Sequence, residues 1–339
     1  EALSHASEDW ILVLDADETL VPGSDEALRE AMGGSHAACF LTVENLLAEG
    51  EIQTVRLLRL FKNRRGIQFR GRVHEQISGS LQDLGLPIGN SRVFIRHDGY
   101  TPALVEARDK HRRNLRLLEA ALADDPDDLY SRYQLGKTFS SMGASEKAEK
   151  TFREVLEKLA LLPVPEAYAF YPKLFVHLAA VQERLFGSSR ALEGIREGVR
   201  LFPGDPEVLW HAGFYAREAG LWDEALLRFE SAHASAKSPK ALGLDFERLG
   251  AMAARSASDL WLKKATMTLD RDLDGAILAY RAALKYDPDL FFAHLALGTI
   301  YFERKRFAPA LSALLEADRI RPGLPEIAFL IRECRRLKP

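Results

Sequence analysis

The sequence predicts a protein of α/β plus all-α structure, in which a sheet domain precedes an array of helices. Short apolar runs that end in acidic or polar residues fill the N-terminal third, as expected for strands of an α/β sheet. The remainder is rich in Leu and Ala, and its small and aromatic residues recur at a 34-residue spacing. We therefore expect a sheet domain over 1–102, a linking helix over 103–125, and a helical repeat array with a capping helix over 126–339.

Composition and charge narrow the classes of function. The 339 residues are 47% hydrophobic and 28% charged, an ordinary globular composition, and no apolar run approaches the roughly 20 residues of a membrane span. A net charge of -3 gives no overall field for capturing nucleic acid. Cys39 and Cys334 form no zinc motif or disulfide framework, which favours a reducing, cytoplasmic setting. The chain opens on Glu1 without a signal-peptide pattern, so we expect it to begin inside a longer protein.

An apolar run from Trp10 to Leu14 predicts a buried strand, and acidic residues follow it directly. Because alternate residues of an extended chain point to the same side, we expect Asp15 and Asp17 to face one ligand. Carboxylates at this spacing suit Mg²⁺ or Mn²⁺ carrying a phosphate. Acidic residues after a strand also often form only a turn or a helix N-terminus, and that alternative stays open.

The rest of the sheet domain contains an expected helix at 25–32 and four more strand-like runs. These runs occupy residues 37–43, 56–61, 71–75 and 93–100. A basic loop at 62–66 is too short to indicate nucleic-acid binding. Pro102 ends the last strand, and apolar residues at helical spacing after it predict a helix that joins the repeats without a flexible linker.

The repeat is clearest near the C-terminus, where small, aromatic and large apolar residues stand in a fixed order. The residues are Leu297, Gly298, Tyr301, Ala310, Leu314, Ala317 and Pro322. Ala276, Ala283 and Pro288 stand 34 residues before their counterparts in this unit. The order is that of the tetratricopeptide repeat, in which two antiparallel helices cross closely at small residues.

Three earlier units follow the same order less regularly. They contain Gly136, Phe139, Gly143, Ala148 and Phe152, then Ala191, Ile195 and Pro203, then Gly213, Gly220, Ala225, Phe229 and Ala232. The spacing from Ala148 to Ala191 is 43 and that from Ala225 to Ala276 is 51, which predicts insertions of about nine and seventeen residues. A charged helix at 325–337 suits a solvent-facing cap. Such solenoids present a concave face that binds peptides or other domains, and a purely structural array is the alternative.

Several motifs of the sheet domain follow one another in a set order. They are Trp-Ile-Leu-Val-Leu-Asp-Ala-Asp-Glu from residue 10, Arg-Leu-Phe from 59, Gly-Arg-Val-His-Glu from 71, Ile-Arg-His-Asp-Gly-Tyr from 95 and Lys-His-Arg-Arg-Asn-Leu from 110. In this order, ahead of repeats, they resemble family 2 glycosyltransferases of the GT-A fold that carry C-terminal tetratricopeptide repeats. The resemblance implies a partial GT-A-like sheet domain, with the family's nucleobase-binding N-terminal half expected upstream of this sequence.

The resemblance also implies roles for individual residues. Asp15, Asp17 and His97 would hold one divalent cation, Mn²⁺ or Mg²⁺, on the diphosphate of a nucleotide-sugar donor. The other candidates are two catalytic residues and two substrate-binding residues, namely Glu75 and His74, and Arg59 and Arg72. Each candidate also has a purely structural interpretation. Glu75 and His74 could lie at an exposed strand end, and His97 could be a hydrogen-bonded histidine beside a turn. The arginines could belong to a solvated basic face.

The sequence thus predicts a metal-dependent glycosyltransferase that moves a sugar to an acceptor recruited by the repeats. The acceptor class stays open among a protein, a glycan and a small molecule, and a protein partner is expected on the concave face. The alternative is a non-catalytic scaffold, in which a truncated transferase domain supports a protein-binding repeat array.

Overall fold

The computed structural model describes residues 2–46, 52–69, 77–97, 104–162, 170–237 and 246–337. The chain divides into two compact units, each with its own interior. The first unit comprises residues 1–202 and 237–246, and the second comprises 203–236 and 247–339. The domain boundaries expected at 102 and 125 are not those of this division, and they stay predictions.

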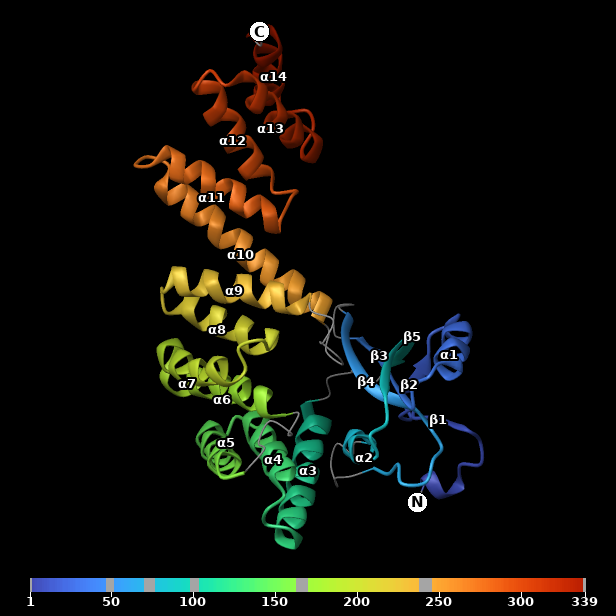
Figure 1. Ribbon diagram of the computed structural model, residues 1–339. Helices are drawn as coiled ribbons and strands as arrows, with labels where there is room; N and C mark the ends of the chain where they lie inside the picture. Colours follow the sequence, from blue (N-terminus) through green and yellow to red (C-terminus); the bar gives the residue numbers. More distant parts are fainter. Residues whose placement is uncertain are drawn as a thin grey trace. The chain divides into compact units, whose positions relative to one another are not determined.

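The described part of the N-terminal region forms one five-stranded mixed sheet (Figure 1). Its strands are β1 (Trp10–Leu12), β2 (Glu18–Leu20), β3 (Ala38–Leu46), β4 (Ile52–Lys62) and β5 (Ile88–His97). The strand order is β1-β4-β3-β5-β2, and only β3 and β5 pair in parallel. Sequence neighbours β1 and β2 therefore lie at opposite edges of this sheet, so the acidic segment between them spans the sheet from one edge to the other.

Two apolar clusters cover the faces of the sheet. One contains buried residues of β3, β4 and β5, including Leu41 and Ile95, against which α1 (Ser24–Gly33) packs its apolar residues. The other contains Phe61 and Leu81, the latter from α2 (Ser78–Asp83). The apolar residues of the central strands are thereby buried on either side of the sheet, while several polar positions of β5 stay exposed.

The structure corrects the strand expectations at several points. The first strand ends at Leu12 rather than Leu14, and its three residues are half-buried at a sheet edge instead of fully buried at the centre. The last strand begins at Ile88, earlier than expected, and residues 98–100 lie outside the described ranges. β2 and α2 were not expected, because three and six residues are too few to show a periodicity.

The rest of the chain is helical, and most of its helices pack as antiparallel neighbours in pairs (Figure 1). In the first unit the helices are α3 (Leu104–Asp124), α4 (Leu129–Ser141), α5 (Ser145–Ala160), α6 (Tyr171–Phe186) and α7 (Ser188–Leu201). In the second they are α8 (Pro206–Glu218), α9 (Trp222–Ala236), α10 (Phe246–Thr268), α11 (Leu273–Tyr286), α12 (Phe291–Glu303), α13 (Phe307–Ile320) and α14 (Pro325–Leu337). The expected linking helix is α3, which packs on α4, and the expected cap is α14.

Glycines on the first helix of three pairs set the distance to the second helix. A Cβ added at Gly136 would lie 2.5 Å from the ring of Phe152, sixteen residues later in the sequence. Gly213 stands in the same relation to Phe229, and Gly298 to Leu314, with Cβ distances of 2.8 and 2.6 Å. The recurring small residues in the sequence therefore mark the positions at which the two helices of a pair are in contact.

The turn between the paired helices repeats as well. Gly143 and Gly220 adopt left-handed φ values of 77° and 76°, seven residues after the packing glycines. The equivalent residue of the last pair is Lys305, the one non-glycine residue with positive φ among those described, at 59°. The left-handed turn conformation of the earlier pairs is thus repeated at a lysine, whose side chain disfavours it.

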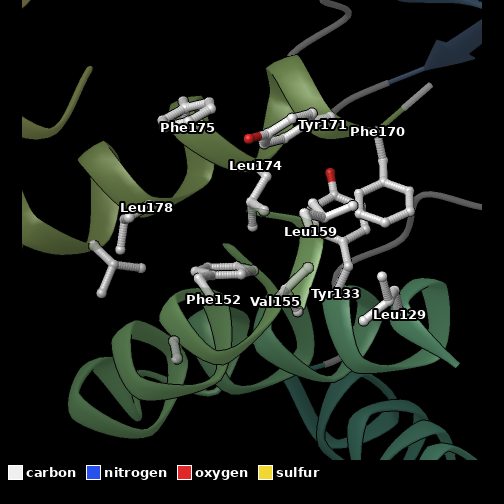
Figure 2. Close-up of a cluster of buried hydrophobic side chains, with 12 residues drawn as sticks. Leu129, Tyr133, Phe152, Val155, Leu159, Phe170, Tyr171, Leu174, Phe175 and Leu178 are labelled. Atoms are coloured by element: carbon white, nitrogen blue, oxygen red, sulfur yellow. The ribbon is translucent and has the colours of Figure 1, made fainter. Parts of the chain in front are cut away.

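Aromatic and leucine side chains fill the space between successive pairs. Figure 2 shows the cluster in the first unit, where Phe152 from α5 faces Leu174 from α6. The ring of Tyr133 stacks on that of Phe170, with centroids 4.7 Å apart. This cluster binds the first pair to the second, although the predicted nine-residue insertion lies between them at the α5–α6 connection.

The second predicted insertion partly lengthens a helix. α10 has 23 residues, whereas α8 and α12 have 13 each. Cys39 and Cys334 are both free and buried, and burial raises the pKa of both thiols. None of the helices in the described ranges has the length and apolarity needed to cross a membrane.

Candidate functional site

The acidic segment after β1 is organised around an arginine. The guanidinium of Arg59 donates to the Asp15 carboxylate at 2.7 Å and to the Glu18 carboxylate at 3.0 Å. Glu18 has a side chain only 3% exposed, and its second oxygen accepts the backbone N–H of Asp15 at 2.9 Å. The buried carboxylate therefore fixes both the loop and the guanidinium, and Arg59 already has two anionic partners.

Asp17 takes a different partner from Asp15. Its carboxylate lies 3.0 Å from Nε2 of His97, because β2 pairs with β5 in a register that sets Glu18 opposite His97. The imidazole is 21% exposed and the carboxylate 54%. The structure thus brings together two of the three predicted cation ligands, while the third is held in an ion pair with Arg59.

The remaining predicted site residues lie outside the described ranges, namely Arg72, His74 and Glu75. Among the described residues, no group of three His, Cys, Asp or Glu side chains is placed to hold a metal ion. Mg²⁺ in proteins is often bound by one or two carboxylates together with substrate phosphates, so the Asp17–His97 pair fits a shared site better than a closed one. The predicted cation stays a prediction.

A second arrangement of charged groups lies on the helical repeats of the first unit. Lys137 on α4 is half-buried, and Lys173 on α6 is close enough for the two ammonium groups to repel. Burial first, and the neighbouring positive charge second, lower the pKa of Lys137. A negatively charged group placed at this pair would offset the repulsion and favour the protonated lysine.

One aromatic ring lies beside the first lysine of the pair. The ammonium of Lys137 lies 5.6 Å from the centre of the Tyr133 ring. The amide of Gln134 donates to the hydroxyl of Tyr130 at 2.6 Å, and burial raises the pKa of that phenol. Tyr133 is itself buried, so the surface offered to a partner here is mainly the positive charge of the two lysines, which suits an acidic peptide.

Sequence reasoning did not find the lysine pair. Lys137 follows the packing glycine Gly136 directly, and Lys173 stands in the first turn of the next repeat. That these two lysines are neighbours could be inferred only once the residues of each repeat had been assigned to their helices. The insertion before α6 hid this alignment, because it removed the regular 34-residue spacing between the first two units.

Comparison with known families identifies the first helical pair. The tetratricopeptide repeat family matches residues 129–157, which span α4 and α5 almost completely. Residues 129–157 form a tetratricopeptide repeat. The tetratricopeptide part of the prediction is thereby confirmed, whereas no glycosyltransferase family was found to match.

A curated relative has the same repeats. The chain is 33% identical over 190 residues to a tetratricopeptide repeat-containing protein of Synechococcus elongatus, and the match covers 54% of this chain and 46% of that protein. The chain therefore spans less than half the length of this relative.

Solved structures resemble the chain in part. YrrB, described as a tetratricopeptide repeat protein with an unusual peptide-binding site, has 16% identity and a TM-score of 0.38, with 64% of this chain and 97% of that chain covered. PcrH from Pseudomonas aeruginosa has 24% identity and a TM-score of 0.33, with 40% and 92% covered.

Proposed function

We propose that the chain is a non-catalytic protein-binding scaffold whose tetratricopeptide repeats recruit a partner through an acidic segment. The observation that carries the proposal is the half-buried lysine pair, Lys137 and Lys173, on two neighbouring repeats of one unit. The positive charge of Lys173 contributes to lowering the pKa of Lys137, and an anionic ligand bound at the pair would offset this repulsion. Helical repeat solenoids commonly use such extended surfaces to bind peptides.

A direct test measures the binding of an acidic peptide to the full chain. The probe is a short fluorescein-labelled peptide with four glutamates among leucines and alanines, and its matched control has glutamines instead. The double substitution Lys137→Gln and Lys173→Gln is expected to weaken binding of the acidic probe about tenfold in fluorescence anisotropy. The variant Lys150→Gln with Lys285→Gln removes the same net charge from exposed helix surfaces and is expected to leave binding unchanged.

Equal affinity for the glutamate and glutamine peptides would contradict the proposal. So would an unchanged affinity of the Lys137→Gln and Lys173→Gln variant for the acidic probe. Because both lysines lie on helix surfaces and glutamine is a good helix former, the variant is expected to fold, which circular dichroism verifies.

A second candidate function is the transfer of a sugar from a nucleotide-sugar. It is favoured by the pairing of Asp17 with His97 at the end of β5, and by the order of motifs that resembles family 2 glycosyltransferases. A divalent cation held there with a diphosphate would neutralise charge on the departing nucleotide. The residues of this chain would supply one carboxylate and one imidazole, with Arg59 orienting the acidic loop through Asp15 and Glu18.

Calorimetric titration of uridine diphosphate with Mn²⁺ into the full chain tests this second candidate. Asp17→Ala removes a proposed ligand, and Asp25→Ala on α1 removes an acidic side chain of the same domain. Binding that only Asp17→Ala abolishes would support the donor site, and no binding at micromolar to millimolar nucleotide would count against it.

A further inference from the structure

Two hollows in the second unit occupy equivalent places in successive repeats. Each is lined by the turn that joins the helices of one pair and by the first helix of the next pair. The first hollow involves the α8–α9 turn and α10, and has a volume of about 350 Å³. The second involves the α10–α11 turn and α12, and has a volume of about 440 Å³. The same backbone arrangement thus produces two cavities whose side chains can be compared directly.

The second hollow has an apolar floor and an acidic rim. Its floor is formed by Leu269, Leu273, Ala296 and Ile300, which belong to or pack against a buried cluster of the repeats. Its rim carries Asp270 and Glu303, both exposed. No lysine or arginine is among the described residues that line it. The hollow therefore has a net negative charge beside apolar surface.

The first hollow differs from the second in its charged side chains. Arg217 and Lys263 both line it, together with Glu218 and Asp259. Arg217 lies 3.0 Å from the Glu218 carboxylate, and the ammonium of Lys263 stands 3.6 Å from the centre of the Trp222 ring. The first hollow therefore has no net charge, because two positive and two negative side chains line it, whereas the second carries two carboxylates and would attract a cation.

We propose that the hollow of the α10–α11 turn and α12 binds a lysine or arginine side chain of a partner peptide. The long apolar stem of such a residue would lie on Leu269, Leu273 and Ile300, while its charged end would reach the two carboxylates at the rim. A free metal ion is a poorer occupant, because the described residues offer two carboxylates and no third ligand. The inference rests on the proposed scaffold function, and it adds the chemistry of a second recognised residue.

The test uses the full chain and three blocked pentapeptides, Gly-Leu-X-Leu-Gly, in which X is lysine, norleucine or glutamate. Binding is followed by NMR through the δ1 methyl group of Ile300, assigned with the conservative variant Ile300→Val. The lysine peptide is expected to shift this methyl signal. Asp270→Asn combined with Glu303→Gln is expected to weaken that binding about fivefold, since exposed charge pairs are individually weak.

The matched control removes two carboxylates from the equivalent hollow. Glu218→Gln with Asp259→Asn is expected to leave the affinity of the lysine peptide unchanged. Norleucine or glutamate peptides that bind as well as lysine would overturn the inference, as would an unchanged affinity of the Asp270→Asn and Glu303→Gln variant. Acidic-peptide binding at Lys137 and Lys173 is measured separately, so the scaffold proposal can stand when this one fails.

Discussion

The sheet and the helical repeats of this chain differ in how far apart in sequence their contacts lie. In the repeats, the packing glycine meets its partner ring sixteen residues later, as for Gly136 and Phe152. In the sheet, Asp17 meets His97 eighty residues away, and Arg59 meets Asp15 across forty-four. Contacts within one repeat recur in every repeat, so the residues that make them recur at a fixed spacing in the sequence. Contacts between distant strands occur once and produce no such spacing.

The largest effect is expected from emptying a repeat core. Phe152→Ala removes a fully buried ring and is expected to lower the free energy of unfolding by about 3–5 kcal/mol, measured by urea denaturation. Phe229→Ala, at the equivalent position of another repeat, is also fully buried and is expected to cost a similar amount. A loss below about 1 kcal/mol in either variant would show that the two cores do not share the inferred packing.

A smaller effect is expected from the long-range ion pair of the sheet. Glu18→Gln removes a buried negative charge that faces Arg59 and is expected to destabilise the protein by about 2 kcal/mol. Glu30→Gln, whose partner Arg92 is 81% exposed, is the control and is expected to change stability little. Equal effects of the two substitutions would contradict the role given to Glu18.

Substitutions in the repeat turns are expected to change stability in opposite directions. Gly220→Ala places a Cβ at a φ of 76° and is expected to cost about 1 kcal/mol. Lys305→Gly relieves a φ of 59° at the equivalent position and is expected to stabilise the protein by about 0.5 kcal/mol, since glycine also loses more entropy on folding. The measurement is the urea midpoint of each variant. Destabilisation by Lys305→Gly would mean that the lysine side chain makes a contact that outweighs its strain.

A pH-dependent effect, reduced because the phenol of Tyr286 is only partly buried, is expected at alkaline pH. Burial, and then a hydrogen bond and the negative charge of Glu230, raise the pKa of Tyr286 to about 12 from its usual value near 10. The folded state then holds this proton when the unfolded state has lost it, so stability is expected to fall as pH rises from about 10 to about 12. Tyr286→Phe is expected to make the melting temperature depend less on pH between about pH 10 and about pH 12. An unchanged pH dependence would contradict the assignment to Tyr286.

The sequence indicated the repeats well and the charged sites poorly, for a physical reason. Glycine, alanine and aromatic spacings record helix contacts inside one pair, so even the insertions were located by their effect on the spacing of Ala148, Ala191 and Ala225. Pairing of Asp17 with His97 was anticipated from motif order alone. The ion pair between Asp15 and Arg59 was not anticipated, because it depends on β1 lying beside β4.

The surface sites could be identified only from the positions of the folded helices. Lys137 and Lys173 become neighbours only because α4 and α6 pack across an irregular insertion. Likewise, Asp270 and Glu303 belong to a turn and to the following repeat, and no spacing rule in the sequence brings them together.

The central claim is that the repeats, and the lysine pair in particular, are where a partner binds. The most direct measurement is photo-crosslinking of the full chain to the acidic peptide carrying a benzophenone side chain, followed by mapping of the adducts by mass spectrometry. We expect adducts on α4 and α6 that disappear in the Lys137→Gln and Lys173→Gln variant. Adducts confined to the sheet region, residues 10–97, would contradict it.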